Sequence, residues 1–358
     1  MIGMRRVEAL REAVRDVVSG AGRTATFAVL FLVLAGGVGL AAELSTIQGI
    51  TAARQYVGSG SATYMMSTQK RIDGRACDAL ASLPNVAAAG AIREDRELFV
   101  SSTLPQTPIS SFSISPGFRD LLTARGDSTR PGIALSEDVA RTLGTDAGEN
   151  LATAHGSTAV NSVFEYPDDG RDSMLAFSVL AVTPLGDQPF DACWVTIWPQ
   201  DESAVAALGR TVLSEAGPSS DRPVLSQLNQ THGAAFTLPR AFGTDSAKLL
   251  AAVVGAVLGA AQVFRRRLVL ASDRHIGVGR LPQVISQTAQ CAVWVSIGAI
   301  GALSAALVPL PPHESDRGPL LTASALILVA GAGSALASCA FATCLIRESS
   351  LFRYFKNR

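Results

Sequence analysis

The chain has 358 residues, of which 48% are hydrophobic and only 17% are charged, and its formal net charge is zero. Its mean hydropathy of +0.28 is high for a soluble enzyme, and the lack of a basic surplus argues against nucleic acid as a partner. The length leaves room for two domains. A membrane protein is therefore the first class to consider.

Four apolar runs are each close to the roughly 20 residues that a helix needs to cross hydrocarbon. The first could instead be a secretory signal, because arginines precede it and small residues end it. A chain that crosses the membrane again usually keeps its first helix, so we expect four transmembrane helices. They are residues 24–44, 247–264, 289–308 and 320–346.

The basic residues set the expected orientation, because Lys and Arg near helix ends favour the cytoplasm. The leader (1–23), the loop after the second span (265–288) and the tail (347–358) are basic, whereas the connection 309–319 holds two acids against one arginine. We therefore expect a multi-pass protein of the bacterial cytoplasmic membrane with both termini in the cytoplasm. Residues 45–246 then form one large extracytoplasmic domain, and residues 309–319 form an external loop.

The leader predicts an amphipathic helix on the cytoplasmic membrane surface. Val7, Leu10 and Val14 recur at helical spacing, while arginines and acids occupy the other face. A solvated arm is the alternative.

The outer segment has the pattern of a small α+β domain. A helix is expected before Pro84, and a second is expected in "LSEDVARTLG", with Ser136 as N-cap and Gly144 as its end. A third helix, "DESAVAALG", is expected to end at Gly209. The expected strands are "ELFV", "SSFSI", "MLAFSVLAV" and "CWVTIW".

The order of these motifs resembles a known family. The stretch "SISPGFRDLLTARGDSTRPGIALSEDVARTLGTDAGENLA", followed by "VLAVTP" and "WVTIWP", resembles the periplasmic core domain of MacB/FtsX-like permeases, the type VII ABC transporter superfamily. The order of one span, an outer domain and three further spans also fits, so the resemblance covers nearly the whole chain. It implies a dimeric permease that transmits ATP-driven movement across the membrane.

The segment "DRHIGVGRLPQVISQTAQ" resembles the cytoplasmic turn with which this family docks on its nucleotide-binding subunit. It departs from the family pattern "R..EIG..RALG....I" at His275, where an acid is common, and Gly279 and Pro282 would shorten or kink a helix. We expect a coupling helix within residues 265–288 whose apolar side chains enter the ATPase. The expected docking residues are Arg274, His275, Ile276, Arg280, Leu281, Val284 and Ile285. A basic stop-transfer loop is the alternative.

ATP chemistry is not expected within this chain. A Walker loop needs a lysine directly after glycine, and none of Lys70, Lys248 and Lys356 follows one. ATP and Mg are therefore expected in a partner ATPase, and this chain is expected to be non-catalytic, with no cofactor and no metal of its own. The four histidines have no Cys or carboxylate at metal-like spacing.

Two further pairs of residues stand out. Cys77 and Cys193 are the only cysteines in the expected outer domain, where a disulfide is possible, and two separate buried thiols are the alternative. Gly255 and Gly259 form a GxxxG in the second span and predict a helix interface, with the first span of a second copy as the expected partner.

The sequence thus favours the permease subunit of an ABC transporter that exports or extracts a peptide, antibiotic or lipid, or regulates envelope proteins. Its expected partners are the ABC ATPase, a second or homologous permease, membrane lipids and an extracytoplasmic protein, with no nucleic acid. The alternative is a membrane-anchored sensor or interaction protein, for example bacteriocin-associated, without transport.

Overall fold

The computed structural model describes residues 6–20, 22–153, 156–186, 188–214, 222–237, 242–309 and 314–347. The chain forms two compact units. One is made of Met1–Thr51 and Leu238–Arg358 and is called the helical unit here; the other, Ala52–Thr237, is called the sheet unit. Apart from Arg347, the predicted tail lies outside the described residues.

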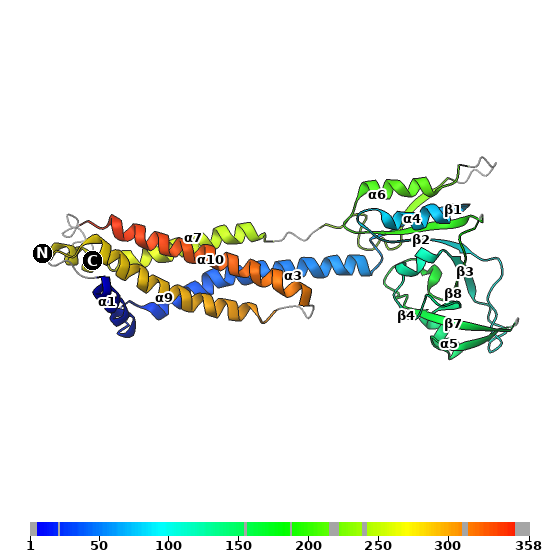
Figure 1. Cartoon of the computed structure of the whole chain (residues 1–358), viewed down its shortest axis with the longest axis horizontal. Helices are drawn as coiled ribbons and strands as arrows, with labels where there is room; N and C mark the ends of the chain where they lie inside the picture. The colour runs from blue at the N-terminus through cyan, green and yellow to red at the C-terminus, as the bar shows by residue number, and fades with distance from the viewer. Residues whose placement is uncertain are drawn as a thin grey trace. The chain divides into compact units, whose positions relative to one another are not determined.

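The helical unit contains the four apolar helices (Figure 1). Helix α2, the π-helical turn η1 and helix α3 form one continuous stretch of 35 residues. All four stretches are long and apolar enough to cross a membrane. The helices are α1 (Arg6–Val18), α2 (Thr24–Phe31), η1 (Leu32–Gly36), α3 (Gly37–Gly58), α7 (Thr244–Arg265), α8 (Arg267–His275), α9 (Arg280–Ala306) and α10 (Glu314–Leu345).

Two helices extend beyond the predicted spans. The first helix continues past residue 44 to Gly58, because no proline interrupts "LSTIQGITAARQYVG" and the chain turns only at Ser59 and Gly60, which has a φ of 81°. Helix α9 begins at Arg280 rather than at residue 289. Its first turns are polar, but Gln283 and Gln287 are buried within the protein, and the Gln283 amide donates to the carbonyl oxygen of Leu270 at 2.8 Å.

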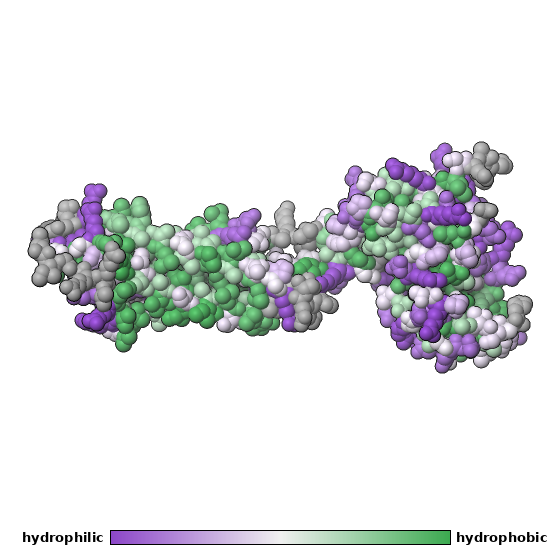
Figure 2. Space-filling view, in the orientation of Figure 1, coloured by the Kyte–Doolittle hydropathy of each residue, from purple (hydrophilic) through white to green (hydrophobic). Residues whose placement is uncertain are grey.

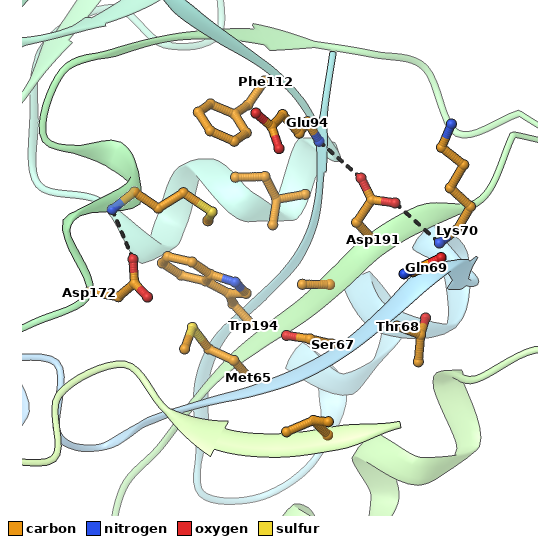
Figure 3. A pocket seen from close by; sticks show the side chains of 14 residues that line it. Met65, Ser67, Thr68, Gln69, Lys70, Glu94, Phe112, Asp172, Asp191 and Trp194 are labelled. Atoms are coloured by element: carbon orange, nitrogen blue, oxygen red, sulfur yellow. Dashed lines mark hydrogen bonds between the residues drawn. The ribbon is translucent and has the colours of Figure 1, made fainter. Parts of the chain in front are cut away.

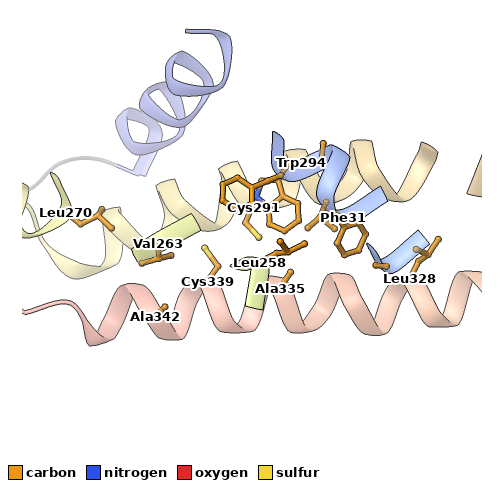
Figure 4. Close-up of a cluster of buried hydrophobic side chains, with 14 of the residues drawn as sticks. Phe31, Leu258, Val263, Leu270, Cys291, Trp294, Leu328, Ala335, Cys339 and Ala342 are labelled. Atoms are coloured by element: carbon orange, nitrogen blue, oxygen red, sulfur yellow. The ribbon is translucent and has the colours of Figure 1, made fainter. Parts of the chain in front are cut away.

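Aromatic side chains fill the centre of the helical unit (Figure 4). Trp294 of α9 lies against Phe27 and Phe31 of α2, with ring centroids 5.6 and 5.8 Å apart. Its indole N–H donates to Oε1 of Gln262 on α7 at 2.7 Å. A buried tryptophan needs such a partner, so this bond fixes the facing sides of α7 and α9.

Helices α7 and α10 approach closely at the GxxxG motif. A Cβ atom on Gly255 would lie 2.0 Å from the carbonyl oxygen of Gly331, and one on Gly259 would lie 2.2 Å from that of Ala335. Ser334 and Ser338 of α10 also donate to carbonyl oxygens of α7, each at 2.7 Å. The glycines therefore serve an interface within one chain, and their predicted pairing with the first span of a second copy is wrong for this face.

The outer face of the helical unit is apolar. Figure 2 shows hydrophobic residues covering the visible side of these helices. Many large apolar side chains are exposed there, as a lipid-facing surface requires. They include Val29, Val33, Leu249, Val253, Val257, Ile297, Ile300, Val329 and Phe341.

The sheet unit is built on a mixed ten-stranded sheet. In sheet order the strands are β10 (Val224–Gln227), β1 (Thr63–Ile72), β9 (Phe190–Ile197), β2 (Val86–Glu94), β3 (Ser110–Ile114), β8 (Ser178–Val182), β5 (Ile133–Ser136), β7 (Gly156–Phe164) and β4 (Ala124–Gly126), and β6 (Asn150–Thr153) pairs with β7. The β3–β8 and β5–β7 pairs are parallel, and the other strand pairs are antiparallel. The predicted strand "ELFV" is absent, because Phe99 forms only an isolated bridge with Ile109.

Short helices accompany the sheet. They are α4 (Gly74–Ala79), η2 (Leu80–Ser82), η3 (Pro116–Leu121), α5 (Glu137–Leu143), η4 (Ser173–Leu175), α6 (Glu202–Ala207) and η5 (Leu208–Thr211). Gly144 ends α5 in the left-handed conformation, with a φ of 64°. Ser136 occupies the N-cap position, but its hydroxyl accepts from the Ser178 N–H at 3.2 Å instead of capping α5. The third predicted helix ends at Ala207, and its last residues continue as the 3-10 turn η5.

A disulfide joins Cys77 of α4 to Cys193 of β9, with the two Cα atoms 5.8 Å apart. Both cysteines are fully buried. Cys193 shares its side of β9 with Val195 and Ile197, which pack in the same cluster as residues of α6. The disulfide therefore fixes α4 onto one face of the sheet. Because successive side chains of a strand point to opposite faces, Ala192 and Trp194 of β9 lie on the other face.

Candidate functional site

A groove of about 480 Å³ lies where α1, α8 and the start of α9 meet. Charged residues of α1, including Glu12 and Asp16, line one side, and Val269 and Asp273 of α8 line the other. The groove thus falls in the region where the sequence predicts cytoplasmic coupling. It is formed by the leader helix as well as by the predicted loop.

An ion pair ties α1 to the rest of the helical unit. Arg266 lies 2.6 Å from the Asp16 carboxylate, and both side chains are about four-fifths buried (21% and 18% exposed). Gln290 of α9 bridges the pair, because its amide donates to Asp16 at 2.9 Å and its oxygen accepts from Arg266 at 2.8 Å. Such shared, partly buried hydrogen bonds hold α1, α7 and α9 in one arrangement.

The acids of the groove influence each other. Partial burial raises the pKa of Glu12, and the nearby carboxylates of Asp16 and Asp273 raise it further. Burial also raises the pKa of Asp273, although Arg266 opposes this. The groove therefore holds a closely spaced group of acids whose charge Arg266 partly balances.

Arg274, a predicted docking residue, is bonded to other parts of the helical unit. Its guanidinium donates to Oε1 of Gln283 at 2.8 Å, to the carbonyl oxygen of Thr343 at 3.0 Å and to that of Ile346. These carbonyls lie at the C-terminal end of α10, where the helix dipole favours a cation. The structure thus uses Arg274 to join α8, α9 and the end of α10.

The predicted apolar docking residues fall into two groups. Ile276 and Leu281 are 77% and 56% exposed, and Val269, which the sequence did not single out, is 49% exposed. Val284 and Ile285 are half-buried. The exposed apolar side chains therefore belong to α8, to the turn after it and to the first turn of α9.

A short helix does lie within residues 265–288, but several of the expected docking residues follow it. The short helix is α8, and residues 280–288 are the first turns of the long helix α9. Helix α8 is separated from helix α9 by a turn that contains Gly277, with a φ of 99°, and Gly279. Pro282 sits in the first turn of α9, where its missing N–H costs no helical hydrogen bond, so it does not shorten the helix. His275 and Arg280 are exposed on either side of the turn.

Sequence reasoning missed the residues that hold this end together. Asp16 looked like one of several charges on the polar side of the leader, and Arg266 like one of a run of arginines. Gln283, Gln287 and Gln290 did carry a signal, because their spacing places three amides on one side of α9. All three are buried.

In the described part of the chain, the groove presents charged and apolar side chains. No three His, Cys, Asp or Glu side chains in that part of the chain come together as a metal site would require. Two of the histidines, His155 and His313, lie outside the described residues. The charged and apolar groups of the groove suit a protein partner.

A scan of protein-family models finds no match to this chain, and a search of curated proteins finds no relative. Among solved structures, the chain is similar to the periplasmic region of MacB from Actinobacillus actinomycetemcomitans, at 12% identity and a TM-score of 0.32, over 44% of this chain and 84% of that one. It is also similar to the extracellular domain of the ABC-type transporter YknZ from Gram-positive bacteria, at 12% identity and a TM-score of 0.31, over 47% of this chain and 100% of that one. TM-scores this low carry no argument about function.

Proposed function

We propose that this chain is the membrane-spanning permease subunit of an ABC transporter, and that a separate ATPase docks on the end of the helical unit formed by α1, α8 and the start of α9. The proposal assigns ATP and Mg to that partner. Two permease chains, identical or homologous, would pair with two ATPase subunits in the bacterial cytoplasmic membrane.

One observation carries the proposal. The α1–α8–α9 end is a fixed platform, held by the Asp16–Arg266–Gln290 bonds and by Arg274 on the carbonyls of α10. Exposed apolar side chains, Ile276 and Leu281 among them, project from this platform. A stop-transfer loop has no need of such bonds, whereas a docking surface needs rigid apolar anchors surrounded by charge.

The same bonds suggest how force would pass from the ATPase to the helices. Movement of α8 would reach α10 through Arg274 and α9 through Gln283, because both contacts are direct hydrogen bonds. The continuous helix from Thr24 to Gly58 runs without a break into the first residues of the sheet unit. We propose that this helix transmits the movement to the outer domain.

The test is to co-express the full chain with ABC ATPase subunits from the same organism and to measure co-purification and ATP hydrolysis in lipid nanodiscs. Leu281→Asp should weaken association by about 1 to 4 kcal/mol, because it places an unpaired carboxylate at an apolar anchor. Arg280→Glu should weaken it more at low salt than at high salt, since exposed charges are screened.

The matched control is Leu307→Asp. Leu307 lies at the other end of the same helix and is also 56% exposed. It should leave association unchanged. If Leu281→Asp inserts normally and still retains the ATPase at full stoichiometry and activity, the docking site is wrong and the non-transporting sensor becomes the better interpretation.

A further inference from the structure

The sheet unit contains a cavity of about 660 Å³ on the face of the sheet opposite the disulfide (Figure 3). Strands β1, β9 and β2 form its floor, and residues from β3, β10 and the turn η4 form its sides. Sites for drug-sized ligands usually have volumes of about 300 to 1,000 Å³. The cavity is therefore large enough for a small peptide or a drug-sized molecule.

The floor of the cavity is apolar and aromatic. It is formed by Trp194 and Ile92, which are at most 2% exposed, together with Met65, and the ring of Phe112 from β3 adjoins it. Met174 of η4, which is 39% exposed, forms part of the side. Methionine adapts to ligands of different shape, and aromatic rings bind both apolar groups and cations.

The rim of the cavity is acidic. Glu94, Asp172 and Asp191 lie around it with one lysine, Lys70. The Asp191 carboxylate is held between β1 and β2, because it accepts from the Lys70 and Glu94 backbone N–H groups, each at 3.1 Å. In Figure 3 the Glu94 carboxyl group lies beside the ring of Phe112. Among the described residues, no basic side chain forms an ion pair with these three acids.

We propose that this cavity binds an amphiphile with an apolar body and one or two basic groups. The apolar part would lie on Trp194 and Phe112, and the basic group would lie at Glu94 and Asp191. A neutral acyl chain would bring no cation to balance the charge of these acids, and an anionic ligand would be repelled. This inference deepens the proposed function by naming a substrate class. Binding of such a ligand is argued from the cavity alone, and only its role as a transported substrate rests on the proposed function.

The experiment uses the full chain in lipid nanodiscs without an ATPase. Binding of Phe-Arg-β-naphthylamide, an apolar probe with two positive charges, is measured by equilibrium dialysis, with empty nanodiscs subtracted. The matched neutral probe is N-acetyl-Phe-citrulline-β-naphthylamide, which keeps nearly the same shape. We expect the charged probe to bind about five-fold more tightly, at the upper end of the range for an exposed ion pair.

Variants then locate the site. Glu94→Gln should weaken binding of the charged probe by about two- to five-fold and leave the neutral probe unchanged. Glu97→Gln is the control, because Glu97 is also exposed but does not line the cavity. Equal binding of both probes, or an equal effect of the two variants, would overturn the proposal.

The outcome is separable from that of the proposed function. Glu94→Gln should not alter co-purification with the ATPase, and Leu281→Asp should not alter probe binding. Loss of ATPase association with intact, charge-dependent probe binding would refute the permease function alone. Intact ATPase association with charge-independent binding would refute the substrate class alone.

Discussion

At the residue scale, Asp169 and Arg171 form a well-enclosed ion pair in the sheet unit. Arg171 donates to both carboxylate oxygens, at 2.9 and 2.7 Å, and to the carbonyl oxygen of Gly58 at 2.9 Å. Its side chain is only 11% exposed. Arg171 thus neutralises Asp169.

This pair predicts an acid-dependent loss of stability. The bonds from Arg171 lower the pKa of Asp169, so the stabilisation is complete above the usual pKa of an aspartate and disappears as the pH falls through the lower folded value. Asp169→Asn should cost about 1 to 2 kcal/mol at pH 7, and the difference from the parent should shrink below about pH 4. Denaturant unfolding of the full chain at pH 7 and below about pH 4 measures this difference in the free energy of unfolding. Asp168→Asn, at an exposed neighbouring acid, should change little at either pH, and a constant effect of Asp169→Asn across pH would contradict the ion-pair explanation.

At the element scale, the contact between α7 and α10 depends on glycine. Gly255→Ala should destabilise the helical unit by about 1 to 3 kcal/mol, because the added methyl would overlap the carbonyl oxygen of Gly331 and force the helices apart. Gly333→Ala is the matched control, since a Cβ atom there would meet nothing within 4 Å. Thermal unfolding in detergent measures both. If Gly255→Ala gained stability as Gly333→Ala should, through the higher helix propensity of alanine, close packing at Gly255 would be contradicted.

The helical and strand segments show which elements a sequence can predict. The apolar runs gave the four long helices, and the "LSEDVARTLG" pattern gave α5, because these signals are local. The ends of α3 and α9 were missed because both helices continue into polar residues, and in α9 other helices bury those residues. "ELFV" failed for the related reason that a strand needs a neighbour, which its own sequence does not specify.

At the scale of the whole molecule, the predicted docking residues do not form one group, and docking itself stays a prediction. Ile276 and Leu281 are exposed as a docking role needs, and a local apolar pattern was enough to select them. Arg274 was chosen for its charge, but only the fold reveals that it binds the end of α10, far away in sequence. Asp16 was overlooked for the same reason, because its partner Arg266 follows it by most of the chain.

The last prediction concerns the side of the membrane on which the sheet unit lies. A buried disulfide, Cys77–Cys193, belongs to the sheet unit, and such bonds persist in oxidising compartments and are rare in the cytosol. The basic loop around Ser272 should then face the cytoplasm, because the helix that joins it to the sheet unit crosses once.

In a background with Cys291, Cys339 and Cys344 replaced by serine or alanine and the disulfide kept, Asp168→Cys should react with an impermeant maleimide in intact cells. Ser272→Cys should react only after permeabilisation, although both positions are exposed in the structure. Reaction of Ser272→Cys in intact cells would reverse the orientation, and it would remove the ATPase-docking proposal as well, because ATP is supplied from the cytoplasm.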